Sequence, residues 1–118
     1  MARLLLVEDD PGYQELIPTI LLGHEFSVCS SAEEARSRLQ IRPFDMLILD
    51  IDLLGISWLQ LLKELKAGGL TEKMPVVMCS SFFTPQQRQQ AMDDGAAGYI
   101  SKPFDAGLLR AMVQALLG

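Results

Sequence analysis

The sequence predicts an α/β fold in which helices cover both faces of a five-stranded parallel sheet. The chain is short, at 118 residues, and its apolar runs of strand length alternate with segments of helical period. The strand runs are also continuously apolar, as expected when crossover helices bury a parallel sheet on both sides. At this length we expect one domain, spanning residues 1–118.

Five runs are expected to be strands, and their polarity suggests their order. The second run is half polar and the fifth is short, so both belong at the edges of the sheet. This arrangement suits a doubly wound, flavodoxin-like (βα)5 sandwich with strand order 2-1-3-4-5. The expected strands are Leu4–Val7, Ser27–Ser31, Met46–Leu49, Val76–Cys79 and Gly98–Ile100.

Between and after these runs lie five segments of helical period. We expect Pro11, after Asp10, in the first turn of the first helix, and Pro85, after Thr84, to start the fourth. Pro18 predicts a kink or an early end in the first helix. The expected helices are Gln14–Leu22, Ala32–Leu39, Trp58–Lys66, Pro85–Asp94 and Leu108–Leu117. In the last, the side chains expected on the sheet are Leu108, Leu109, Met112, Val113, Leu116 and Leu117.

Charge and composition exclude several classes of function. Ten Lys and Arg against fifteen Asp and Glu give a net charge of −5, which repels nucleic acid and anionic lipid. We therefore expect no direct nucleic acid binding by this domain. No apolar run approaches the ~20 residues of a membrane span, and the first residues lack a signal peptide, so a cytoplasmic location is expected. Cys29 and Cys79 are expected to be buried, reduced thiols.

Polar residues gather where the expected strands end. In an open parallel sheet, ligands bind outside the carboxyl ends of the strands, near the point where the strand order reverses. Here that point lies between the first and third strands. The residues at these ends are Glu8, Asp9 and Asp10 after the first strand, Asp50 and Asp52 after the third, Ser80 and Ser81 after the fourth, and Ser101 and Lys102 after the fifth.

These residue types together indicate a phosphoryl-accepting site. Clustered carboxylates repel one another by ~1 to 4 kcal/mol per close pair, so a cation must compensate, and Mg²⁺ is the natural partner of oxygen ligands. Lys102 supplies a second positive charge. An aspartate beside Mg²⁺, a lysine and a hydroxyl can accept a phosphoryl group, so Asp50 is the candidate acceptor, with Ser80 as the hydroxyl.

Four motifs together resemble those of the receiver domains of bacterial two-component response regulators, of the chemotaxis-regulator type. The resemblance covers essentially the whole chain. The motifs are Leu-Leu-Leu-Val-Glu-Asp-Asp at 4–10, Asp-Met-Leu-Ile-Leu-Asp at 45–50, Pro-Val-Val-Met-Cys-Ser at 75–80 and Gly-Tyr-Ile-Ser-Lys-Pro-Phe at 98–104.

The resemblance implies a role for each site residue. Glu8 and Asp9 would bind Mg²⁺ together with Asp50, and the backbone carbonyl of Asp52 would complete the metal shell. Asp50 would take the phosphoryl group from a phosphohistidine of a sensor histidine kinase or phosphotransfer protein. Lys102 would pair with the phosphate. Such a domain is a signalling module that catalyses at most its own phosphorylation and dephosphorylation.

The resemblance also implies a conformational switch. Ser80 would be the switch hydroxyl, and Tyr99 the aromatic residue that changes rotamer when Ser80 is drawn to the phosphate. The surface of the fourth helix, fifth strand and fifth helix would then change and meet a downstream effector protein or domain, or a second copy in a phosphorylation-dependent dimer. Lys102-Pro103 resembles the cis peptide of the family. The glutamine-rich segment Gln86–Gln90 belongs to this surface.

Two departures from the family pattern keep alternatives open. Asp52 stands where the family usually has a neutral or amide side chain, and we hypothesise that it alters phosphorylation kinetics. In the next loop, residues 54–58 read Leu-Gly-Ile-Ser-Trp instead of Pro-Gly-Met-Asp-Gly, so Trp58 either packs over the loop or offers an aromatic anchor. Both features motivate an alternative reading as a phosphorylation-independent interaction module.

A second alternative is a haloacid-dehalogenase-type phosphohydrolase. The sequence Asp50-Ile51-Asp52 resembles the Asp-x-Asp nucleophile motif of those enzymes, in which the second aspartate is the acid and base. Those enzymes, however, carry the motif after the first strand and need a longer chain. Their mechanism would also leave Glu8 and Asp9 without a role.

Overall fold

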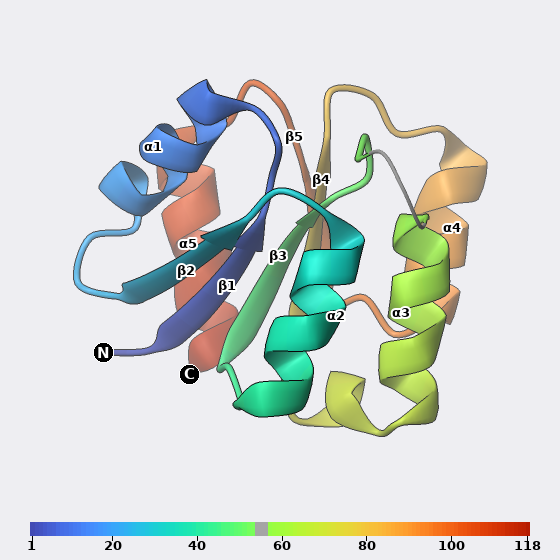
Figure 1. The fold of residues 1–118 in the computed structure, drawn as a ribbon. Coiled ribbons are helices and arrows are strands. Elements are labelled where there is room, and N and C mark those ends of the chain that lie inside the picture. The colour runs from blue at the N-terminus through green and yellow to red at the C-terminus, as the bar shows by residue number, and fades with distance from the viewer. Residues whose placement is uncertain (54–56) are drawn as a thin grey trace.

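The computed structural model describes residues 1–53 and 57–118 and has the predicted doubly wound α/β architecture (Figure 1). Its five strands form one parallel sheet in the order β2-β1-β3-β4-β5, which confirms the predicted order and places β2 and β5 at the edges. The strands are β1 (Arg3–Val7), β2 (Glu25–Cys29), β3 (Met46–Asp50), β4 (Val76–Ser80) and β5 (Gly98–Ser101).

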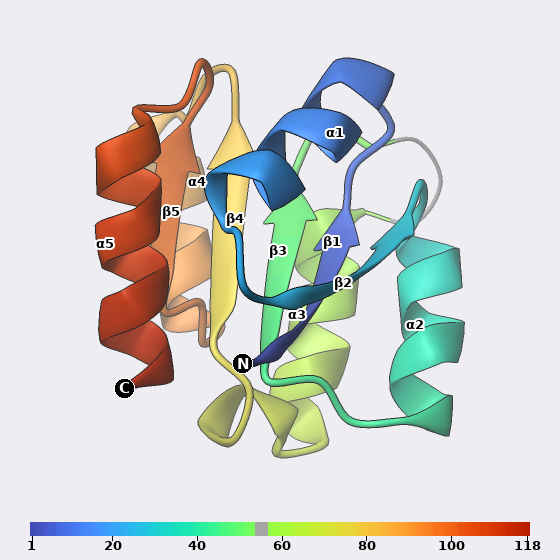
Figure 2. The same cartoon turned by 90° about the vertical axis from the view of Figure 1, so that its left-hand side faces the viewer.

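In residues 1–53 and 57–118, five α-helices cover the sheet in two layers. α1 and α5 lie on one face, and α2, α3 and α4 lie on the other (Figure 2). A short 3₁₀ helix, η1 (Leu70–Glu72), is the one element of the described residues that the sequence pattern did not predict. The helices are α1 (Pro11–Ile20), α2 (Ala32–Ile41), α3 (Trp58–Ala67), α4 (Pro85–Asp93) and α5 (Ala106–Leu117).

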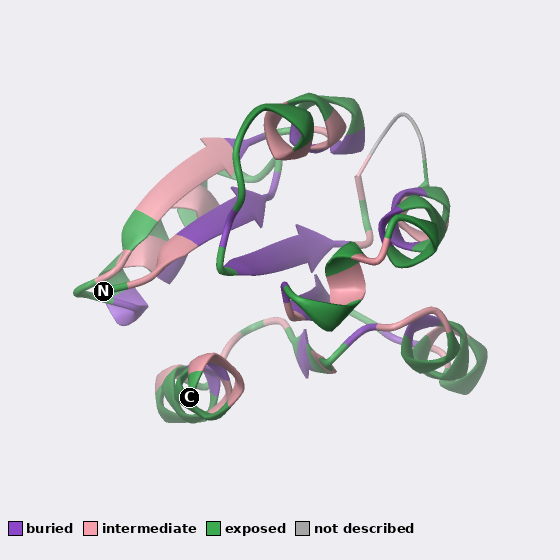
Figure 3. Cartoon of the chain, turned by 90° about the horizontal axis from the view of Figure 1, so that it is seen from below, coloured by how far each residue is buried: buried purple, intermediate pink, exposed green. Residues whose placement is uncertain are grey.

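The core consists of two apolar clusters separated by the sheet. In β1, Leu4 and Leu6 pack toward α1 and α5, whereas Leu5 and Val7 pack toward α2, α3 and α4. This alternation follows from the two-residue period of a strand. Seen from below, the central strands are buried and the outer faces of the helices are exposed (Figure 3). Continuously apolar strands are thus explained by burial on both faces.

Side-chain caps determine where two helices begin. Asp10 accepts hydrogen bonds from the backbone N–H of Gly12 and of Tyr13, at 2.7 and 3.4 Å. α1 begins at Pro11, which confirms Pro11 in the first turn, although the predicted range began three residues later. The helix continues through Pro18 and ends at Ile20, two residues short of the predicted end. Thr84 forms the predicted start of α4, with a reciprocal pair of 3.0 Å hydrogen bonds to Gln87.

Two expectations about individual elements were wrong. β2 covers Glu25–Cys29 instead of Ser27–Ser31, because Glu25 pairs with Arg3 of β1 while the Ser31 hydroxyl caps α2. Leu108 is 56% exposed instead of lying on the sheet. It is one residue, about 100° of helical rotation, from the buried Leu109, and it projects from the first turn of α5 into solvent.

Two lysines of α3 bind the C-terminal end of α4. Lys66 Nζ donates a 2.7 Å hydrogen bond to the backbone carbonyl of Asp93, the last residue of α4. Lys63 Nζ lies 3.9 Å from a carboxylate oxygen of Asp94. No helix in the described part of the chain is both long and apolar enough to cross a lipid bilayer.

Candidate functional site

Strand alternation brings three charged side chains to one side of the sheet. Glu8, Asp50 and Lys102 each lie two residues beyond a strand residue whose side chain packs with α1 and α5. Side chains two residues apart point to the same face of a strand, so all three side chains point to the face of the sheet that α1 and α5 cover. The preceding residues are Leu6, Ile48 and Ile100. The predicted gathering of these groups is therefore observed.

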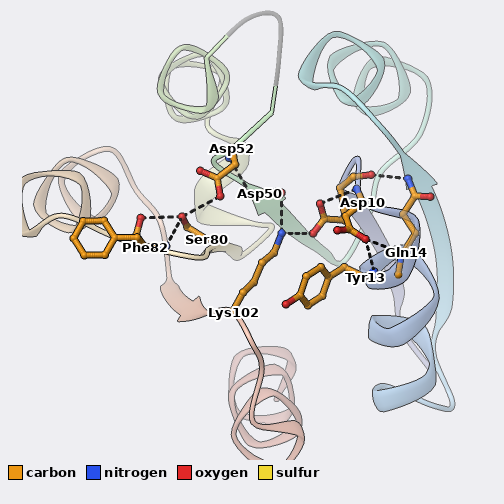
Figure 4. Close-up of polar contacts among 10 residues, drawn as sticks. Asp10, Tyr13, Gln14, Asp50, Asp52, Ser80, Phe82 and Lys102 are labelled. Atoms are coloured by element: carbon orange, nitrogen blue, oxygen red, sulfur yellow. Dashed lines mark hydrogen bonds and ion pairs between the residues drawn. The ribbon is translucent and has the colours of Figure 1, made fainter.

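Lys102 lies between two buried carboxylates (Figure 4). Its Nζ is 2.5 Å from Glu8 Oε1 and 2.9 Å from Asp50 Oδ2. The side chains are 6%, 0% and 1% exposed for Lys102, Glu8 and Asp50, so these charges interact in a medium that screens them far less than water does. One ammonium does not neutralise two carboxylates, and the group retains a net negative charge.

Burial and the neighbouring charges both act on the pKa of Glu8. Burial, and then the neighbouring Asp50, raise the pKa of Glu8 from 4.5 to about 7, although contacts with Lys102 and with the backbone N–H of Asp10 act in the opposite direction. For Lys102, burial alone would lower the pKa, but its contacts with Glu8 and Asp50 outweigh burial and raise it. The lysine thus stays charged, while the buried glutamate holds a proton more tightly than an exposed one.

A third carboxylate completes an oxygen cluster. Glu8, Asp9 and Asp50 each offer one oxygen, and these oxygens lie within 4.8 Å of one another. Asp9 is exposed, so the cluster opens to solvent at this side chain. Oxygen ligands of this kind suit a hard divalent cation such as Mg²⁺, whose charge would offset the excess negative charge. The donor set present therefore fits the predicted metal.

The carboxylate of Asp52 faces Ser80. Its Oδ2 lies 3.3 Å from Ser80 Oγ, whereas its backbone N–H donates a 2.9 Å hydrogen bond to Asp50 Oδ1 (Figure 4). The side chain of Asp52 is thus separate from the oxygen cluster. The predicted use of its backbone carbonyl as a metal ligand stays a prediction.

The Ser80 hydroxyl is bonded to the loop that follows β4. It donates to the carbonyl of Phe82 at 2.9 Å and accepts from the N–H of Phe82 at 3.1 Å. Ser80 lies on the α3 and α4 side of the sheet, because it follows Met78, which packs in that layer. In the described part of the chain, its hydroxyl bonds to Phe82 and Asp52 and not to Asp50.

Tyr99 lies on the same side of the sheet as Ser80, and its side chain is partly exposed. β4 and β5 pair so that Tyr99 is next to Met78, whose side chain packs toward α3 and α4. Its ring centroid is 5.4 Å from that of Phe83, and the Arg88 guanidinium carbon lies 5.3 Å from the ring centroid. Tyr99 is 37% exposed, and its predicted change of rotamer stays a prediction.

Sequence reasoning missed three contacts around the site. The ring of Tyr13 lies 4.5 Å from Lys102 Nζ, the Gln14 amide donates a 2.6 Å hydrogen bond to the carbonyl of Glu8, and the backbone of Phe82 holds Ser80. The expected first turn at Pro11, directly after Asp10, was the available signal for the first two, because it places the start of α1 beside the acids. Side-chain contacts of this kind depend on rotamers, which strand and helix periodicity does not determine.

Other predictions near the site have mixed outcomes. The Lys102-Pro103 peptide is cis, as the resemblance implies. Cys29 and Cys79 are buried, free thiols, as expected, and burial raises the pKa of Cys29 to about 11. Trp58 is partly buried and packs against the core between the sheet and α2, α3 and α4. Its predicted contact with the preceding loop involves residues 54–56, which lie outside the described residues.

Known proteins resemble the chain in sequence. The sequence model of the response regulator receiver domain matches residues 4–114. Response regulator protein FleR of Pseudomonas aeruginosa is 35% identical over 114 residues, which are 95% of this chain and 24% of FleR. The phosphate regulon transcriptional regulatory protein PhoB of Rhizobium meliloti is 33% identical over 119 residues, covering 99% of this chain and 52% of PhoB. The chain therefore spans about half of one relative and a quarter of the other.

Solved structures agree with this result. A response regulator structure from Chloroflexus aurantiacus has a TM-score of 0.90 at 30% identity, covering 98% of this chain and 97% of that chain. Chemotaxis protein CheY4 of Vibrio cholerae has a TM-score of 0.89 at 24% identity and 98% coverage of both chains, which supports the fold alone. In addition, Asp50 ends β3, the third strand, and Glu8 and Asp9 lie beside it, which favours a receiver site over the hydrolase alternative.

Proposed function

Because the chain belongs to the response regulator receiver family, we propose that it is a single phosphoacceptor domain whose Asp50 receives a phosphoryl group from a phosphohistidine. The donor would be a sensor histidine kinase or a phosphotransfer protein. The observation that carries this proposal is the position of Asp50, whose carboxylate lies against the Lys102 ammonium and beside the oxygens of Glu8 and Asp9.

The proposed transfer is a displacement at phosphorus. A carboxylate oxygen of Asp50 attacks the phosphorus atom, an O–P bond forms, and the N–P bond to the imidazole breaks. The electron pair of that bond returns to the imidazole nitrogen, which takes up a proton. Lys102 is close enough to offset negative charge on the transferred oxygens, as phosphoryl transfer requires. The domain acts on itself only and is a signalling module, not an enzyme with turnover.

Glu8, Asp9 and Asp50 are the residues that would hold Mg²⁺, with the backbone carbonyl of Asp52 as a further proposed ligand. When bound, the ion supplies positive charge that neutralises the phosphoryl oxygens. The supporting observation is that these three residues place carboxylate oxygens within 4.8 Å of one another, beside the single positive charge of Lys102. A divalent cation would replace the proton that Glu8 otherwise favours.

Phosphorylation is proposed to act on the output surface through Ser80 and Tyr99. New oxygens on Asp50 offer an acceptor for the Ser80 hydroxyl, which would leave its contacts with Phe82. A phosphoryl group thereby favours one arrangement of the loop after β4 over another, which is the requirement for a population shift. Tyr99 would follow by a change of rotamer, altering the surface of α4, β5 and α5.

That surface is the proposed contact with a downstream effector protein or domain, or with a second copy in a phosphorylation-dependent dimer. The relatives FleR and PhoB are longer than this chain, and the name of PhoB describes a transcriptional regulator. The net charge of −5 supports a protein partner over direct binding of nucleic acid by this domain.

Acetyl phosphate supplies a test that needs no partner. The chain is incubated with acetyl phosphate and Mg²⁺, and intact mass spectrometry should show one added phosphoryl group. The adduct should be lost in Asp50→Asn and without Mg²⁺. It should be kept in the matched control Asp45→Asn, which changes an exposed aspartate immediately before β3. No adduct on Asp50 would support the phosphorylation-independent module, and sustained hydrolysis of a generic phosphoester would support the hydrolase.

A further inference from the structure

We infer that Tyr13 is a positioning residue for phosphoryl transfer, whose ring holds the Lys102 ammonium between Glu8 and Asp50. This inference rests on the proposed function of the site. The ring centroid of Tyr13 lies 4.5 Å from Lys102 Nζ, within the range of a cation–π contact. Figure 4 shows the Tyr13 ring beside the Lys102 side chain.

The ring takes the place of water around the ammonium. An ammonium has three N–H donors, and Glu8 Oε1 and Asp50 Oδ2 lie within 2.9 Å of Nζ. Tyr13 presents its π face to the same nitrogen, and the side chain of Lys102 is only 6% exposed. A cation–π contact is stronger when the cation is removed from water, as it is here. The ring thus stabilises the ammonium at the site without adding a third carboxylate that would compete with Glu8 and Asp50 for it.

The Tyr13 ring is itself held on two sides. The backbone N–H of Tyr13 lies in the first turn of α1 and donates a 3.4 Å hydrogen bond to the carboxylate of Asp10. Its ring meets Phe104 edge-on, with a centroid separation of 5.3 Å and an interplanar angle of 78°. Aromatic pairs favour such an edge-to-face arrangement. α1 and the segment between β5 and α5 therefore determine together where the ring lies.

A long lysine side chain needs such a partner. Its four-carbon stem has several rotatable bonds, and the ammonium would otherwise sample positions away from Asp50. Phosphoryl transfer requires the ammonium to be in place when the phosphoryl oxygens arrive. A charge that is already held in the productive geometry does not have to be ordered at that moment, so the entropic cost of ordering it is avoided. Tyr13 does not touch the reacting atoms; it acts through Lys102.

Two variants separate the π contact from simple packing. Tyr13→Phe keeps the ring and removes the hydroxyl, whereas Tyr13→Leu keeps an apolar side chain and removes the π face. In the metal-free, unphosphorylated chain, NMR should show the Lys102 ε-methylene protons shifted upfield by the ring in the wild type and in Tyr13→Phe, and unshifted in Tyr13→Leu. Tyr99→Leu is the control, because Tyr99 lies on the other side of the sheet and should leave the Lys102 signals unchanged.

The rate of labelling by acetyl phosphate with Mg²⁺ gives the second readout. We expect Tyr13→Phe within about twofold of the wild type and Tyr13→Leu at least about tenfold slower, because a cation–π contact removed from water is worth more than one factor of ten. Equal rates for the wild type and Tyr13→Leu, or an equal loss in both Tyr13 variants, would overturn the inference. Absence of a ring-shifted Lys102 signal in the wild type would also overturn it. An unlabelled wild type with that signal present would instead contradict the proposed function.

Discussion

Replacing Lys102 by methionine tests whether this ammonium stabilises the two buried carboxylates. The stem keeps its length, but Glu8 and Asp50 lose a positive charge that lies 2.5 and 2.9 Å from their oxygens. Removing one partner of a buried ion pair costs about 3–5 kcal/mol in the free energy of unfolding. We expect about 3 kcal/mol, because Glu8 can take up a proton and so avoid part of the repulsion.

The loss should depend on pH with a definite sign. The pKa of Glu8 is raised from 4.5 to about 7 in the folded chain, so the folded state binds more protons than the unfolded state between these values. The free energy of unfolding therefore falls as pH rises through this range. Without Lys102, the pKa of Glu8 rises further and the decline continues to higher pH. The difference between wild type and Lys102→Met should be larger at pH 8 than at pH 6.

Urea denaturation in EDTA, followed by the fluorescence of the single tryptophan, Trp58, measures this effect. EDTA prevents a divalent cation from replacing the ammonium. The matched control is Lys63→Met, since Lys63 is 60% exposed and its ion pair is 3.9 Å long, and its change should stay below about 1 kcal/mol. The double variant Lys102→Met with Glu8→Gln should recover much of the loss. A Lys102→Met chain as stable as the control, or no recovery in the double variant, would refute this reasoning.

Three further outcomes are expected. Asp52→Asn should speed labelling by acetyl phosphate and slow loss of the phosphoryl group, by about two- to fivefold each, because it removes a negative charge near Asp50. Labelling and decay rates identical to those of the wild type would exclude an effect of Asp52 on phosphorylation kinetics. Cys29 and Cys79 should not react with a thiol reagent at pH 8 until urea unfolds the chain, because burial raises the pKa of both thiols; fast labelling of the native chain would contradict their burial. Gly95→Ala should destabilise the chain more than Gly69→Ala, by about 1 kcal/mol or more in thermal unfolding. Both glycines have positive φ, but an added Cβ would lie 3.0 Å from a neighbouring side chain at Gly95 and would meet nothing within 4 Å at Gly69. Equal losses would show that the neighbouring side chain moves away.

The gathering of the site residues could be predicted because it follows from strand periodicity. Continuous apolar runs locate the buried strands, and the residue after each run must lie at the carboxyl end of the sheet. Glu8, Asp50 and Lys102 share one side because each continues a row of core side chains. No rotamer needs to be known for this step. The strand order followed from the polarity of the edge strands.

Rotamers and local competition explain what could not be predicted. The Ser80 hydroxyl bonds to the loop backbone at Phe82, and this choice depends on loop geometry that periodicity does not describe. Ser31 has the polarity of an edge strand but caps α2 instead, because its hydroxyl accepts the N–H of Glu34. Leu108 matches the apolar period of α5 and is nevertheless exposed, because it projects from the first turn of the helix, about 100° around the axis from the buried Leu109.

The two lysines of α3 anchor the C-terminal end of α4. Lys66 and Lys63 contact Asp93 and Asp94, whereas the opposite end begins at Pro85, five residues after Ser80. Nine residues at ~1.5 Å each give a rod of about 13 Å. With the C-terminal end anchored, a shift of ~1 Å at the end near Pro85 would turn the helix axis by about 4°, given that length. Any rearrangement that begins at Ser80 would reach a neighbouring molecule as a change of angle, greatest beside the loop and smallest at α3.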